Sequence, residues 1–233
     1  MKLSSLALLS TFALACSGAA PPDPGTDDAA APADDGGATP DSATPVEAAA
    51  PADAAPPACT YPNGPYGPGL GQTISPSFSW QGYAPNETTV STLKSRDLFD
   101  CDGSKGIDAI LIDVSAGWCA ACETQAHDEA QLTGTYDQLG VKAVTLLIMD
   151  AAENAATTDT ALDWRTTYHL DDVGVYADPN FLLQPNEQTI GLPITLLVDP
   201  RTMKVVKKTE GYGSQYPIQV DPDVAALAKK NGG

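Results

Sequence analysis

A Cys-x-x-Cys motif at the end of an apolar run is the feature that most constrains the fold of this chain. Residues 107–114 have the composition of a buried strand, with one acid, Asp113, inside it. The motif follows as Cys119 and Cys122, directly after Trp118. At a helix N-terminus, unpaired backbone N–H groups and the helix dipole stabilise a thiolate. The order therefore predicts a strand, a turn and a helix that begins at a reactive cysteine.

Apolar runs predict the strands of the chain, and apolar residues at helical spacing predict its helices. Gly140 ends the helix after the motif, and the turn at residues 199–202 joins two strands into a hairpin. Earlier in the chain we expect a short strand at residues 77–80 and a short helix at 89–99. The later expected elements are a helix at 119–132, strands at 141–149, 173–176, 192–198 and 204–209, and helices at 158–169 and 222–230.

The net charge of −18 is distributed unevenly along the 233 residues. Residues 17–58 hold eight acids, no Lys or Arg and no aromatic residue, and Ala, Pro, Asp and Gly dominate them. Such a segment buries too little apolar surface to offset its ordering entropy, so we predict an extended tether. Residues 59–233 still carry a formal charge of −11 and are long enough for one domain. This acidity argues against nucleic acid and anionic lipid headgroups as partners.

The first 16 residues read as a targeting segment. Lys2 precedes an apolar stretch that is too short to span a bilayer. Small residues, Ala13 and Ala15, stand before Cys16, which resembles a bacterial lipoprotein signal; an ordinary signal peptidase could cut the same bond. We therefore predict a signal peptide at 1–15, a lipidated Cys16 with its tether at 16–58, and a domain at 59–233. The predicted location is the bacterial cell envelope, facing the periplasm or the exterior, with a lipid anchor as the only membrane contact.

The remaining cysteines divide into two pairs. Cys59 and Cys101 lie in turn-rich sequence without a redox spacing, so we predict a structural disulfide that fastens the N-terminal arm; two unpaired thiols are the alternative. A zinc site at the Cys-x-x-Cys motif would need two further ligands, and the chain has two histidines. A c-type haem site would need His where Glu123 stands. We therefore predict no metal and no cofactor.

The order of elements, the Cys-x-x-Cys motif and Pro193 before an apolar strand resemble the thioredoxin superfamily. The gap between Cys122 and Pro193 is longer than in a minimal thioredoxin, and the helix at 158–169 and strand at 173–176 fill it. Together with the export signal and the arm, this resembles the TlpA/ResA-type redoxins over about residues 72–230. The resemblance implies an α/β thioredoxin-like fold: a central mixed sheet flanked by helices, with an extra helix–strand insertion and an N-terminal arm.

The resemblance also implies roles for individual residues. Cys119 would attack a partner's disulfide, Cys122 would resolve the mixed disulfide, and Asp113 would take the proton from Cys122. A solvent-facing Asp113 at a strand end is the alternative. Trp118 would offer partners a partly exposed apolar surface, or else belong to the core.

A cis bond at Pro193 would aim the backbone of Leu192 at a substrate chain; an ordinary strand boundary is the alternative.

These roles predict an exported, membrane-tethered thiol–disulfide oxidoreductase that reduces proteins. Its expected partners are envelope proteins with disulfides and a membrane electron donor. Two other functions stay open at this point. The same cysteines would suit a copper-binding metallochaperone on the same fold, and the same chemistry run in another direction would suit an oxidant or isomerase.

Overall fold

The computed structural model describes residues 59–184, 191–214 and 218–232. The predicted signal peptide, the lipidation of Cys16 and the tether at 16–58 lie outside these residues. Within the described part of the chain, no helix combines the length and apolar character that crossing a membrane requires.

A seven-stranded mixed sheet in the order β2-β1-β5-β4-β3-β6-β7 forms the centre of the domain. β3 is parallel to β4, and β4 to β5, while the other neighbouring pairs are antiparallel. Every residue of β3 is buried, which explains its nearly continuous apolar sequence. The strands are β1 (Ser79–Tyr83), β2 (Val90–Lys94), β3 (Ala109–Ala116), β4 (Val141–Met149), β5 (Gly174–Ala177), β6 (Ile194–Asp199) and β7 (Lys204–Glu210).

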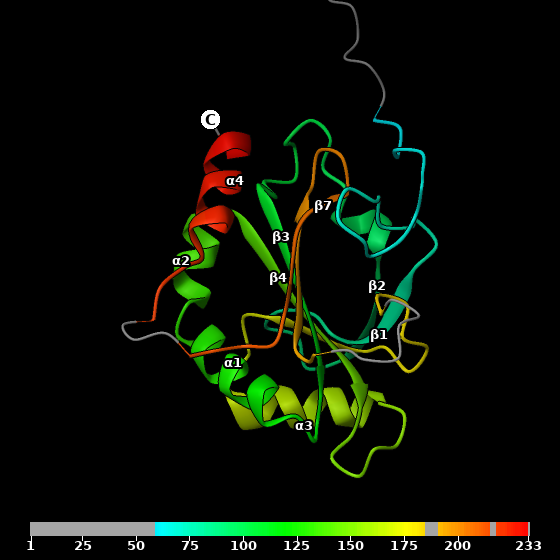
Figure 1. Cartoon of the computed structure of the whole chain (residues 1–233), viewed down its shortest axis with the longest axis vertical. Coiled ribbons are helices and arrows are strands. Elements are labelled where there is room, and N and C mark those ends of the chain that lie inside the picture. The colour runs from blue at the N-terminus through cyan, green and yellow to red at the C-terminus, as the bar shows by residue number, and fades with distance from the viewer. Residues whose placement is uncertain (1–58, 185–190, 215–217, 233) are drawn as a thin grey trace, which may run out of the picture. The chain divides into compact units, whose positions relative to one another are not determined.

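Four α-helices flank this sheet (Figure 1). α1 connects two parallel strands, β3 and β4, which need a long crossover because a tight turn cannot join them. α3 packs on β1, β4 and β5, whereas α4 packs on β3. The helices are α1 (Ala120–Ala130), α2 (Thr133–Gln138), α3 (Thr158–Tyr168) and α4 (Pro222–Gly232).

The prediction of a helix at residues 89–99 is wrong. This segment forms the edge strand β2 and then a 3-10 helix, Ser95–Leu98. β2 pairs antiparallel with β1, and its side chains alternate between exposed and half-buried positions. Pairing with the neighbouring strand therefore decides the conformation of a stretch whose local signal is weak.

The expected helix at 119–132 ends earlier, at Ala130, and a separate short helix, α2, follows and includes Gly134.

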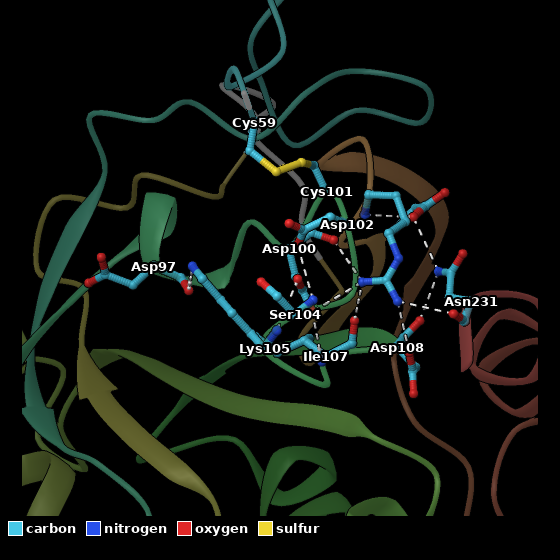
Figure 2. Close-up of polar contacts among 12 residues, drawn as sticks. Cys59, Asp97, Asp100, Cys101, Asp102, Ser104, Lys105, Ile107, Asp108 and Asn231 are labelled. Carbon is cyan, nitrogen blue, oxygen red and sulfur yellow. Dashed lines mark hydrogen bonds and ion pairs between the residues drawn. A yellow bond between two sulfur atoms is a disulfide. The ribbon is translucent and has the colours of Figure 1, made fainter. Parts of the chain in front are cut away.

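At the end of β3 away from the Cys-x-x-Cys motif, a cluster of polar residues joins three parts of the chain. Arg201 forms ion pairs with Asp100 at 3.1 Å and with Asp108 at 2.9 Å, and donates to the carbonyl of Asn231 in α4. A disulfide between Cys59 and Cys101 lies beside this cluster (Figure 2). The start of the described chain, the segment before β3 and the end of α4 are thereby held together.

Candidate redox site

The two cysteines of the motif are joined in a disulfide at the start of α1. Cys119 is the N-cap residue, and its Sγ accepts a hydrogen bond from the backbone N–H of Cys122 at 3.1 Å. This N–H is one of the donors that a helix leaves unpaired in its first turn, and the helix dipole adds positive potential there. The position therefore stabilises negative charge on the Cys119 sulfur once the disulfide is reduced.

The segment between β3 and α1 runs close to the end of β4. A Cβ on Gly117 would stand 2.6 Å from the backbone nitrogen of Ala151, so this position admits only glycine without a backbone shift. The backbone N–H of Gly117 donates to the carbonyl of Met149 at 3.0 Å. Trp118 follows and is 48% exposed, next to the buried Cys119. An apolar ring is thus presented to solvent next to the disulfide.

Pro193 lies at the end of β3 that leads into the cysteine motif. The bond between Leu192 and Pro193 is cis. β6 begins at Ile194, which pairs with Val114 near the end of β3, so Pro193 stands level with the residues that lead into the motif. Among the described residues, no hydrogen-bond partner is found for the backbone N–H and C=O of Leu192. An extended chain could therefore pair with them.

Asp113 is buried in β3, with 2% of its surface exposed. Its Oδ1 accepts hydrogen bonds from Gln125 Nε2 and from the Thr195 hydroxyl, each at 2.5 Å. Its Oδ2 has no partner in the described part of the chain. Burial raises the pKa of Asp113 to about 6, and the hydrogen bonds from Thr195 and Gln125 lower it only in part. The solvent-facing alternative for Asp113 is therefore excluded.

A second buried carboxyl group, on Glu129, was missed by the sequence reasoning. Glu129 is 3% exposed and accepts one hydrogen bond, from the Thr145 hydroxyl at 3.5 Å. Burial raises its pKa well above the ordinary value, and the charge of Asp113 raises it further. Cys122, Gln125 and Glu129 follow one another at helical spacing, so polar residues on the inward face of α1 were a usable signal.

A cavity of about 250 Å³ contains both carboxyl groups. It runs from Asp113 and Gln125, near the motif, to Lys207 and Asp221, whose side chains are partly exposed. The cavity therefore links the buried carboxyl group of Asp113 to the surface.

Among the residues that the structure describes, no group of three metal ligands includes a cysteine of the motif. In the described residues, the one group of three potential metal ligands that lie together is Cys59, Cys101 and Asp102, and its two cysteines are paired in a disulfide. Both histidines, His127 and His169, are exposed on the surface.

Asp113→Asn is expected to change how stability depends on pH. Because the folded state binds the Asp113 proton more tightly than the unfolded state, stability falls as pH rises from about 4 through 6. A shift from 3.8 to about 6 corresponds to about 3 kcal/mol. Asparagine keeps the acceptor for Gln125 and Thr195, so the variant should lose this decline and become the more stable protein at pH 7. Urea denaturation of both proteins from pH 4 to 8 measures the difference, and parallel curves would contradict the prediction.

Strand order and site geometry together define a class of protein. A mixed sheet with β3-α1-β4 at its centre, an antiparallel β6–β7 pair, a Cys-x-x-Cys disulfide at the N-terminus of α1 and a cis-proline before β6 make this a thioredoxin-fold protein. The predicted fold class, including the inserted helix and strand that became α3 and β5, is confirmed.

Three solved structures illustrate what this chain is similar to. An uncharacterized conserved protein from Geobacillus kaustophilus matches with a TM-score of 0.50 and 15% identity, over 70% of this chain and 84% of its own. A thioredoxin-family thiol:disulfide interchange protein from Chlorobium tepidum matches with a TM-score of 0.45 and 18% identity, over 68% of this chain and 97% of its own. A thiol:disulfide interchange protein from Bacteroides sp. has a TM-score of 0.46 and 13% identity, over 69% and 91%. No protein-family profile matches the sequence, and no curated protein matches it.

Proposed function

We propose that this protein is a thiol–disulfide oxidoreductase that reduces disulfides of other proteins. The observation that carries the proposal is the Cys119–Cys122 disulfide at the N-terminus of α1. Leu192, whose backbone has no hydrogen-bond partner among the described residues, lies at the same end of the sheet. A reactive thiolate and a resolving thiol one turn away are what thiol–disulfide exchange requires, and backbone groups open to pairing would hold a polypeptide substrate.

The chemistry starts from the reduced pair. The Cys119 thiolate attacks one sulfur of the partner's disulfide; a Cys119–partner bond forms, the partner's disulfide breaks, and its other sulfur leaves as a thiolate. Cys122 then gives its proton to a carboxylate oxygen of Asp113 and attacks the Cys119 sulfur. This forms the disulfide that the structure contains and releases the partner's second thiolate. Two electrons pass to the partner, whose thiolates take protons from water.

Geometry supports Asp113 and the substrate residues in these roles. Gln125 and Thr195 occupy Oδ1 of Asp113, so the unpartnered Oδ2 is the oxygen available to a proton. A pKa of about 6 suits a group that both accepts and returns a proton near neutral pH. The exposed ring of Trp118 and the backbone of Leu192, held by Pro193, would contact the partner chain.

Export, anchoring and the choice of partner are part of the same proposal. The sequence of residues 1–58 supports an exported lipoprotein on a charged tether, held at the cell envelope through Cys16. Envelope proteins with disulfides would then be its substrates. A membrane-bound dithiol donor would reduce the Cys119–Cys122 pair again after each turnover.

The reduction potential of the Cys119–Cys122 pair tests the proposal. We expect a value near that of thioredoxin, about −270 mV, because Ala120 and Ala121 bring no positive charge that would stabilise the Cys119 thiolate, and with it the reduced form, further. The protein would be equilibrated in thiol/disulfide buffers and its free thiols alkylated. Mass spectrometry of its peptides would then distinguish the Cys119–Cys122 pair from Cys59–Cys101. A potential near −120 mV would indicate an oxidant instead. A pair that never oxidises would exclude redox function and favour metal binding.

A further inference from the structure

The cavity beside Asp113 contains a second buried carboxyl group, that of Glu129, which the proposed reaction does not use. Asp113 on β3 and Glu129 on α1 both line it. In the register of the sheet, Asp113 lies directly between Thr195 of β6 and Thr145 of β4. Thr195 donates to Asp113, and Thr145 donates to Glu129, so the two carboxyl groups occupy neighbouring positions over adjacent strands.

The hydrogen bonding of Glu129 suits a protonated acid better than a carboxylate. A buried carboxylate needs several donors to replace its hydration, because burying an uncompensated charge costs far more than burying a neutral group. Glu129 receives one long hydrogen bond, and its Oε1 has no partner in the described part of the chain. A protonated carboxyl group needs fewer donors and has an O–H of its own to offer to water or to a carboxylate.

Among the titratable groups around Glu129, the negative charge of Asp113 opposes its ionisation. Asp113 faces it from β3, Tyr136 from α2 and Tyr212 from the segment after β7. The Tyr212 hydroxyl donates to Asp128 at 2.7 Å, so this hydrogen is already used.

The one cation that lines the cavity is held by other acids. Lys207 of β7 lies 2.7 Å from Asp221 and 2.6 Å from Asp223, at the surface end. The described lining therefore offers Glu129 one neighbouring anion and no free cation.

We propose that Glu129 is a second proton carrier of the redox site, which holds a proton at neutral pH and exchanges it with Asp113 through this cavity. The inference rests on the proposed function, because Asp113 receives its proton from Cys122 in that reaction. Along α1, Gln125 stands three residues after Cys122 and holds Asp113, and Glu129 stands one turn further from the disulfide. A proton delivered to Asp113 therefore passes by way of Glu129 toward the cavity mouth and water.

Infrared spectroscopy of the full-length oxidised protein tests the protonation of Glu129 directly. A protonated carboxyl group has its own C=O stretching band, which shifts in D₂O. We expect wild type to show such a band at pH 7 and Glu129→Gln to lack it. In Asp113→Asn, the Glu129 band should disappear at a lower pH than in wild type, because the neighbouring negative charge is gone. Asp178→Asn is the matched control: Asp178 is also fully buried but lines a different cavity, so the Glu129 band should be unchanged.

Turnover provides the second readout. Glu129→Gln should slow disulfide reduction roughly three- to ten-fold above pH 7, less than the loss of a direct general acid or base would. Glu129→Asp, which keeps a carboxyl group, should restore most of the rate. Far-UV circular dichroism checks that each variant is folded.

Each outcome separates this inference from the proposed function. A neutral-pH band that persists in Glu129→Gln, or a Glu129 titration that does not move in Asp113→Asn, would overturn the proton-carrier role while wild-type turnover stays intact. Wild type without any disulfide-reducing turnover would instead overturn the proposed function, and the proton-carrier role with it.

Discussion

Replacing Cys119 with serine is expected to abolish disulfide reduction, with a loss of at least about 10³-fold in rate. The serine hydroxyl does not ionise near neutral pH, and the thiolate is the nucleophile of the reaction. Replacing Cys122 with serine should have a different result. The first attack by Cys119 still occurs, but no thiol follows to resolve the product, so the mixed disulfide with a substrate accumulates. Reduction of a model protein disulfide measures the first effect, and non-reducing mass analysis measures the second.

The second cysteine pair supplies the control for this experiment. The Cys59–Cys101 disulfide lies at the opposite end of β3, so replacing both of these cysteines with alanine should leave the rate per folded molecule unchanged. Equal activity of Cys119→Ser and wild type would remove the redox assignment. A Cys122→Ser variant that binds no substrate covalently would show that Cys119 does not attack first.

Replacing Arg201 with methionine is expected to destabilise the fold by about 3–5 kcal/mol. The Asp100 side chain is fully buried, and Arg201 Nη1 lies 3.1 Å from its Oδ2. The same guanidinium also donates to the carbonyls of Asp100 and Ile107, at 2.7 Å and 2.9 Å. Methionine fills similar space but leaves the buried carboxylate without its counter-charge, which costs more than the pair itself contributes. Guanidinium denaturation of the oxidised protein measures the change.

A surface ion pair offers the matched comparison. Lys208 lies 2.9 Å from Glu210, and both side chains are partly exposed, so Lys208→Met should cost at most about 1 kcal/mol. Adding Asp100→Asn to Arg201→Met should recover part of the lost stability, because the fully buried side chain at position 100 is then neutral. If Arg201→Met lowered the free energy of unfolding by no more than Lys208→Met does, the cluster in Figure 2 would not contribute to the stability of the fold.

Patterns along the chain predicted the α/β order because each signal is local. Buried strands such as β3 and β4 need long apolar runs, and the helix after the motif needs only its start signal and spacing. The segment at residues 89–99 had no such signal, and its strand β2 exists because β1 is there to pair with it. The fold class therefore followed from local sequence, whereas the edge of the sheet did not.

The site divides in the same way. Cys119, Cys122 and the acid Asp113 are visible in the sequence because their types and spacings are unusual for a strand and a helix start. Nothing in the type or spacing of Gln125, Glu129 and Thr195 marks them as site residues. Gln125 and Thr195 are 70 residues apart in the sequence, and the polar partner of each residue is known only from the fold.

The sequence by itself thus indicated which sulfur atoms can exchange electrons, because two cysteines separated by two residues at a predicted helix start can form a reducible disulfide. Only the tertiary structure decided which carboxyl groups are buried and bind protons more tightly than usual. Protonation depends on burial, on hydrogen-bond donors and on neighbouring charge, and these are set when α1, β3, β4 and β6 pack around one cavity.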